Sequence, residues 1–198
     1  MYSTTYAILF LVGLCRVLVG AQPLDVLAPR EYKDWTNFKD INPWSLPEHY
    51  VKGTGDKAGS VYLGHERIRC GVVAFDGSTG IWMIPANNNF ETVGYILPRG
   101  GYDIEKDKDM GDCVLREALE EGGLVISRSS LKPLGLSKGG SVFWFKGTVT
   151  KTVTPTEVRA HPPKLFSLTN APKELQKPLK SPQKKEDMRM AFSVAERL

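Results

Sequence analysis

Cysteine is scarce in this sequence, which excludes a scaffold built from disulfides. Of the three cysteines, Cys15 lies in the apolar N-terminal segment, so Cys70 and Cys113 remain for at most one disulfide in the rest of the chain. Cys70 lies in an apolar, strand-like run and Cys113 near the start of a predicted helix. Free cysteines in such places usually pack as small hydrophobic side chains. We therefore expect two buried thiols.

A long apolar run is lacking as well. The longest, Ala7 to Val19, falls short of the ~20 apolar residues that a membrane-spanning helix needs, and Arg16 interrupts it. The small residues Gly20 and Ala21 follow, a pattern typical of a signal-peptide cleavage site. We therefore expect residues 1–21 to be a signal peptide rather than an anchor. The mature protein would then be secreted and would have no membrane contact.

A strong excess of one charge is also missing. Lys and Arg number 26 against 22 Asp and Glu, and the net charge of +4 falls by one if Arg16 leaves with the signal peptide. Such a mild excess is not the basic footprint of a nucleic-acid-binding surface. The sequence therefore gives no strong indication of a nucleic-acid partner, and it leaves the oligomeric state open.

The rest of the chain divides into an arm and a single domain. Residues 22–60 form an irregular, Pro- and Gly-containing arm, whose aromatic side chains should attach it to a core: Trp35, Phe38, Trp44 and Tyr50. Residues 61–198 have the length of one domain. Hydrophobic patterning predicts strands at 67–75, 81–85, 92–97, 131–136 and 141–149, helices at 110–122 and from about 184, and mostly loop at 150–183.

Three acidic side chains lie close together on the first predicted helix. Glu117, Glu120 and Glu121 are spaced so that their carboxylates project within about one helical turn. Three like charges this close repel one another, whereas a divalent cation needs such a cluster of hard oxygen ligands. Glutamate-rich helix faces are more often solvated surface, so the decision depends on the neighbouring sequence.

That neighbouring sequence carries a known motif. Residues 99–124, RGGYDIEKDKDMGDCVLREALEEGGL, resemble the signature of the Nudix hydrolase superfamily, and Arg116 to Leu124 match its core at every fixed position. The resemblance implies an α/β fold, an α/β/α sandwich with a mixed β-sheet. It also implies metal-dependent hydrolysis of a phosphoanhydride, with Mg²⁺ as the cofactor and Mn²⁺ as the alternative.

The resemblance assigns roles to individual residues. Glu117 and Glu121 would be metal ligands, Glu120 a ligand or the base that activates water, and the Gly101 carbonyl a further ligand. In one place the motif differs from the family: a glutamate is expected eight residues before Arg116, where this chain has Lys108, and the loop carries one extra residue. The candidates to replace that mainly structural glutamate are Glu105, Asp107, Asp109 and Asp112.

Within the superfamily, the lead-in Tyr-Ile-Leu-Pro-Arg-Gly-Gly is similar to that of the diphosphoinositol polyphosphate phosphohydrolases. This likeness implies a small polyphosphate substrate, and it implies these phosphate-binding residues: Arg67, Arg69, Asn88, Asn89, Arg99 and Lys138. A highly phosphorylated substrate needs several converging cations. Together with a signal peptide, the motif resembles the secreted Nudix effectors of plant-pathogenic fungi, virulence proteins that are delivered into host cells.

Two other functions stay open. The same metal site could hydrolyse dinucleotide polyphosphates, nucleotide sugars or RNA caps, and base recognition would then use aromatic stacking by residues such as Phe90, Tyr95, Trp82 or Trp144. Alternatively, the altered loop could belong to a non-catalytic protein that binds a phosphorylated ligand or a host protein.

Overall fold

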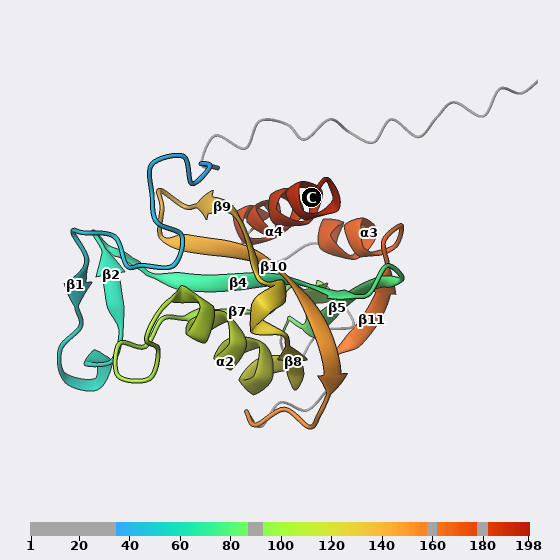
Figure 1. Ribbon diagram of the computed structural model, residues 1–198, viewed down its shortest axis with the longest axis horizontal. Coiled ribbons are helices and arrows are strands. Elements are labelled where there is room, and N and C mark those ends of the chain that lie inside the picture. The colour runs from blue at the N-terminus through green and yellow to red at the C-terminus, as the bar shows by residue number, and fades with distance from the viewer. Residues whose placement is uncertain (1–34, 87–92, 158–161, 178–181) are drawn as a thin grey trace, which may run out of the picture. The chain divides into compact units, whose positions relative to one another are not determined.

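A computed structural model of the chain describes residues 35–86, 93–157, 162–177 and 182–198 (Figure 1). The described elements all belong to one unit, Glu31–Leu198. The predicted signal peptide lies outside the described residues, as do Asn88, Asn89 and Phe90. None of the described helices is long and apolar enough to cross a membrane.

A mixed β-sheet of eight strands forms the centre of the fold. Its main order is β11-β5-β4-β10-β8, and β6, β7 and β9 add to β5, β4 and β10 respectively. β4 and β10 run parallel and every other described pair in the sheet is antiparallel. The strands are β4 (Arg69–Asp76), β5 (Gly80–Pro85), β6 (Tyr95–Ile96), β7 (Arg99–Gly101), β8 (Leu124–Ile126), β9 (Lys132–Ser137), β10 (Val142–Thr152) and β11 (Lys164–Ser167).

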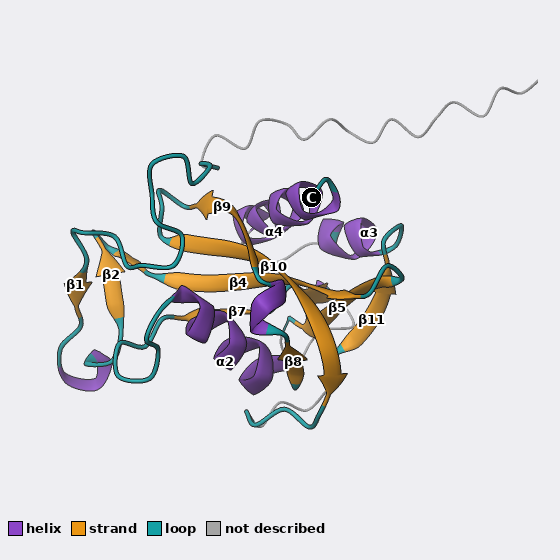
Figure 2. Cartoon of the chain, in the orientation of Figure 1, coloured by secondary structure: helices purple, strands orange, loops and turns teal. Residues whose placement is uncertain are grey.

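Helices cover both faces of this sheet. Figure 2 shows α2 (Met110–Gly122) on one side, and α3 (Ala171–Gln176) and α4 (Pro182–Glu196) on the other. A short 3-10 helix, η2 (Arg128–Ser130), connects β8 to β9. The expected α/β/α sandwich with a mixed sheet is therefore confirmed.

The alternation of side chains along β4 explains why the strand is buried throughout. Successive side chains of a strand point to opposite faces. Cys70 and Val72 accordingly belong to the hydrophobic cluster beneath α2, whereas Val73 and Phe75 belong to the cluster beneath α3 and α4. Trp144 of β10, which is fully buried, fills the second cluster.

The described part of the arm packs against this core through its aromatic side chains, as the sequence predicts. Trp44 lies 5.2 Å from Phe145 between ring centroids, and the Trp44 carbonyl accepts a hydrogen bond from the Met110 amide at the first residue of α2. A small three-stranded sheet follows, formed by β1 (Val51–Lys52), β2 (Val61–Leu63) and β3 (Glu66–Arg67), with the 3-10 helix η1 (Gly55–Lys57) before β2. The arm thereby helps to position α2.

Several short elements depart from the predicted pattern. β7 and β8 have three residues each and were not expected, since such strands exist only through their pairing with β4 and β10. The region 150–183, expected to be mostly loop, contains the end of β10 together with β11 and α3. Non-local pairing explains these differences, because periodicity cannot reveal it in so few residues.

The expectation of two free thiols is wrong. Cys70 and Cys113 form a disulfide with a Cα–Cα distance of 6.2 Å, and both residues are fully buried, as expected. The bond connects β4 to α2 across a sequence separation of 43 residues. Only the packing of the helix on the sheet brings the two sulfur atoms together, so the sequence alone left the pairing undecided.

Candidate active site

Helix α2 presents the predicted acidic residues, and its two ends are fixed by local interactions. Asp109 is the N-cap, and its side chain accepts a hydrogen bond of 2.9 Å from the Asp112 amide. Arg128 forms ion pairs with both Asp109 and Asp112. Gly123 ends the helix in the left-handed conformation, with φ 60°, which glycine adopts without steric cost. The helix therefore has the bounds that the sequence predicts.

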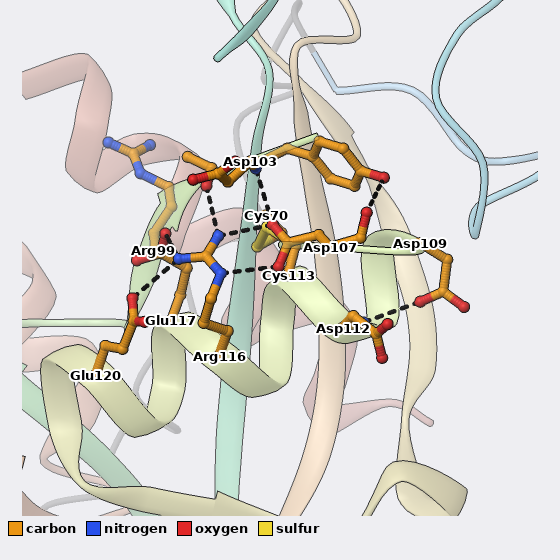
Figure 3. The surroundings of a disulfide bond; sticks show 12 residues. Cys70, Arg99, Asp103, Asp107, Asp109, Asp112, Cys113, Arg116, Glu117 and Glu120 are labelled. Atoms are coloured by element: carbon orange, nitrogen blue, oxygen red, sulfur yellow. Dashed lines mark hydrogen bonds and ion pairs between the residues drawn. A yellow bond between two sulfur atoms is a disulfide. The ribbon is translucent and has the colours of Figure 1, made fainter. Parts of the chain in front are cut away.

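Arg116 is the centre of the hydrogen-bond network on this helix (Figure 3). Its guanidinium donates to the Asp107 carboxylate at 2.7 and 2.8 Å, to Glu117 at 2.8 Å and to Glu120 at 2.9 Å. It also donates to the Gly101 carbonyl at 2.8 Å. The hydrogen bonds that Arg116 donates to Asp107 raise the pKa of Arg116 further above its usual value. One cation thus holds two predicted catalytic carboxylates and the predicted carbonyl ligand together.

Among the residues that the sequence offers in place of the missing glutamate, Asp107 pairs with Arg116. Its side chain is 1% exposed and accepts a further hydrogen bond of 2.8 Å from the Asp103 amide. The Tyr102 hydroxyl donates to the Asp107 carbonyl at 2.7 Å. Two other candidates, Asp109 and Asp112, pair with Arg128 instead. The carboxylate that pairs with Arg116 therefore comes from Asp107, one position before Lys108.

Glu117 lies on the buried side of α2, against β7. A Cβ atom at Gly100 would lie 1.7 Å from a carboxylate oxygen of Glu117, so a larger residue there would displace this carboxylate. Burial raises the pKa of Glu117, the neighbouring charges of Glu120 and Glu157 raise it further, and Arg116 opposes this effect. A buried carboxylate with a raised pKa is stabilised by an added cation.

The carboxylates of Glu117, Glu120 and Glu121 supply the hard oxygen ligands that a divalent cation needs. Glu120 is partly exposed, and Glu121 accepts a hydrogen bond of 3.3 Å from the Arg99 amide of β7. Within the described residues, no three acidic, His or Cys side chains already converge on one point. The ion pairs of Arg116 with Glu117 and Glu120 account for this, since a metal ion would compete with Arg116 for the same oxygen atoms.

The predicted phosphate-binding cation Arg67 lies beside β7. Its guanidinium occupies the space above Gly101, where a Cβ atom would come within 2.1 Å of it. Arg67 Nε is buried and has no hydrogen-bond partner among the described residues. Because neighbouring residues of a strand face opposite sides, Arg67 at Gly101 and Glu117 at Gly100 lie on opposite sides of β7. An unpaired buried donor at this position fits an oxyanion.

Lys138, Arg69 and Arg99 lie near one another. The Arg69 amide donates to the Ser141 carbonyl at 2.8 Å, which holds the turn that carries Lys138 beside the start of β4. Burial, followed by the charge of Arg99, lowers the pKa of Lys138. The structure therefore brings together Arg67, Arg69, Arg99 and Lys138, while Asn88 and Asn89 lie outside the described residues.

Two acidic residues near the site were not predicted. Asp187 of α4 is fully buried and lies 3.6 Å from the guanidinium of Arg99, which also stacks over Trp144 at 6.0 Å. The Glu157 amide donates to the Glu120 carbonyl at 3.0 Å, so the segment after β10 brings another carboxylate toward Glu117. No local pattern marks either residue, because each approaches the site only through the folding of the chain.

Three of the four aromatic candidates for base stacking pack in or against the core, and Phe90 lies outside the described residues. Trp144 is fully buried, and Tyr95 packs against Phe166 with ring centroids 5.1 Å apart. Trp82 packs against the cluster beneath α2 and donates a hydrogen bond of 3.2 Å to Asp76. Among the described residues, these side chains serve the core, which weakens the case for a nucleotide base in the site.

Comparison with known proteins gives distant structural similarities. No family model and no curated protein matches the chain. Its structure is similar to that of a Nudix hydrolase from Nitrosomonas europaea, with 14% identity, a TM-score of 0.47, and 66% of this chain and 88% of that chain covered. An ADP-ribose pyrophosphatase from Streptococcus suis is 16% identical, with a TM-score of 0.44 and coverage of 66% and 92%. The Nudix domain of Shewanella oneidensis NrtR, complexed with ADP-ribose, is 17% identical, with a TM-score of 0.44 and coverage of 66% and 84%.

Proposed function

We propose that the chain is a Nudix-type pyrophosphohydrolase that uses Mg²⁺, or alternatively Mn²⁺, to cleave a phosphoanhydride. The observation that carries the proposal is the network of Arg116. It gathers Glu117, Glu120 and the Gly101 carbonyl at β7. The motif resemblance assigns metal binding to these same groups, although the chain reaches the arrangement through a shifted aspartate.

The metal would be held by Glu117, Glu120, Glu121 and the Gly101 carbonyl. When bound, the ion would neutralise phosphate charge and lower the pKa of the attacking water. Glu120 is the residue we assign as the base, because its side chain is 30% exposed whereas that of Glu117 is 10% exposed. A base needs access to the water from which it takes a proton. Arg116 would keep the carboxylates oriented while they exchange one of their contacts for the metal.

The substrate class that we propose is the diphosphoinositol polyphosphates. Four cations support it, Arg67, Arg69, Arg99 and Lys138, because charge-assisted bonds to several phosphates must replace lost hydration. The core packing of the aromatic candidates favours this class over substrates with a nucleotide base. Dinucleotide polyphosphates, nucleotide sugars and RNA caps remain the second candidates.

We also propose export and an effector-like role inside a host cell. The Cys70–Cys113 disulfide supports export, because such bonds form in oxidising compartments. The expected signal peptide, residues 1–21, supports the same conclusion. An enzyme delivered in this way would remove inositol pyrophosphates in the host.

The test compares residues 22–198 with the Glu120→Gln variant, each with Mg²⁺, on inositol pyrophosphates, diadenosine polyphosphates, ADP-ribose and capped RNA. We expect the unsubstituted protein to release phosphate fastest from the inositol pyrophosphates, and E120Q to be far slower on every substrate. Faster turnover of a nucleotide substrate would refute the proposed substrate class. Inertness of both proteins, together with retained binding of an inositol pyrophosphate, would identify a non-catalytic binder.

A further inference from the structure

The Cys70–Cys113 disulfide lies directly behind the candidate active site. Cys113 is one helical turn before Glu117 on α2, and Figure 3 draws the disulfide together with Arg116, Asp107 and Glu117. Neither the motif nor the proposed chemistry uses the disulfide. It nevertheless lies one helical turn from Glu117, the most buried of the candidate metal ligands.

A closed circuit of contacts passes through this bond. From Cys113 the circuit follows α2 to Glu117, whose carboxylate lies against Gly100. Gly100 pairs with Cys70 across the β7–β4 ladder. The disulfide then joins Cys70 to Cys113 and closes the circuit. Each segment of the circuit is short, so the distance between α2 and β7 at Glu117 is fixed by covalent bonds and a strand pairing.

The burial of Glu117 makes such a restraint useful. Glu117 is buried between α2 and β7, and its carboxylate pairs with Arg116 of the same helix. The position of this carboxylate over β7 therefore depends on how α2 packs on the sheet. The apolar side chains of α2 hold the helix there, but packed helices still shift by ~1–2 Å. A covalent bond one turn away from Glu117 limits the shift.

We propose that the Cys70–Cys113 disulfide is a positioning element of the active site, which holds Glu117 at the correct height over β7 for metal binding. This inference rests on the proposed function. A disulfide that only stabilised the fold would not act selectively on one part of the site. A positioning disulfide should instead affect metal binding and turnover, which depend on the carboxylates of α2. Two of the proposed phosphate-binding cations are carried by elements that the disulfide does not join, Arg67 by β3 and Lys138 by the turn before β10, whereas Arg69 is next to Cys70 on β4.

The test uses the double variant C70A/C113A in residues 22–198. A misplacement of about 1 Å in a catalytic group can lower turnover by about a hundredfold. We therefore expect kcat to fall by about tenfold to a hundredfold, while KM for an inositol pyrophosphate changes by less than about twofold. Electron paramagnetic resonance of free Mn²⁺ should show weaker Mn²⁺ binding. Amides of residues 117–121 should exchange hydrogen faster in the metal-free protein.

The control is Leu131→Ala, which removes a side chain from the same hydrophobic cluster at Gly147 of β10. It should lower the melting temperature yet leave kcat, Mn²⁺ affinity and the exchange of residues 117–121 close to those of the unsubstituted protein. If C70A/C113A behaves like Leu131→Ala in these three measurements, the disulfide only stabilises the fold and the proposal is overturned.

Failure of the proposed function would look different. In that case the unsubstituted protein would neither hydrolyse the substrates nor bind Mn²⁺. Hydrogen exchange in the metal-free proteins then decides whether the disulfide positions α2: faster exchange at residues 117–121 in C70A/C113A alone supports the restraint, and equal exchange in both variants refutes it.

Discussion

Asp107→Asn is the substitution that most directly tests the network around Arg116. The Asp107 side chain is 1% exposed and accepts three hydrogen bonds of 2.7 to 2.8 Å, two from Arg116 and one from the Asp103 amide. Asparagine has the same shape, but one of its two terminal atoms is a donor, which would face the guanidinium. The variant therefore removes a buried charge and one acceptor without opening a cavity.

The expected loss in the free energy of unfolding of D107N follows from these contacts. Removing one partner of a buried ion pair costs about 3–5 kcal/mol. Arg116 keeps its bonds to Glu117, Glu120 and the Gly101 carbonyl, so the low end applies, about 3 kcal/mol. For a domain of this size that loss lowers the melting temperature by about 6–12 °C. Thermal unfolding in the metal-free state measures it directly.

A second effect concerns metal binding. Without the Asp107 charge, Arg116 would be balanced only by Glu117 and Glu120, and it would compete more strongly with a cation for their oxygen atoms. We expect D107N to weaken Mn²⁺ binding as well as the fold. The matched control is Asp56→Asn, since Asp56 is exposed in η1 and should change stability by less than about 0.5 kcal/mol. Equal melting temperatures for D107N and D56N would refute the assigned role of Asp107.

Three further predictions concern charge. Burial raises the pKa of Glu117, so the stability that this carboxyl group contributes is present at low pH and is lost as the pH rises through that pKa. Metal-free Glu117→Gln should therefore gain stability relative to the unsubstituted protein between pH 4 and 7, measured by chemical denaturation. Burial lowers the pKa of Lys185 from 10.5 to about 8, so the folded state loses this proton at a lower pH than the unfolded state. The unsubstituted protein should therefore gain stability relative to Lys185→Met as the pH rises from about 8 to 10.5. A difference in unfolding free energy that stays constant over this range would contradict the shift. Arg67→Ala should raise KM for an inositol pyrophosphate by about tenfold with a smaller effect on kcat, and an unchanged KM in steady-state assays would remove Arg67 from the substrate site.

The sequence predicted those parts of the fold and site that depend on local interactions. Helix α2 has the expected bounds because Asp109 caps its start and Gly123 ends it, and both effects act within a few residues. The ion pair between Arg116 and Glu120 is a local interaction of the same kind, since residues four apart on a helix are neighbours. The four cations were named from the motif resemblance, and their role as phosphate ligands stays a prediction.

The remaining features depend on contacts between distant parts of the chain. Four acidic residues were candidates to replace the missing glutamate, and the path of the 102–109 loop brings Asp107 to Arg116. The disulfide, β7 and the approach of Asp187 to Arg99 all require the packed sheet. No local sequence pattern marks a buried acidic residue such as Asp187, which contacts the site from a helix distant in sequence.

The two glycines of β7 have a consequence for the way the site is divided. A single extended backbone, with no side chain on either surface, is all that separates the carboxylate at Gly100 from the guanidinium at Gly101. The two opposite charges therefore lie on the two surfaces of one strand. An added methyl group on either surface would displace the side chain on that surface alone, so the proposed metal ligand and the proposed phosphate-binding cation could be perturbed one at a time.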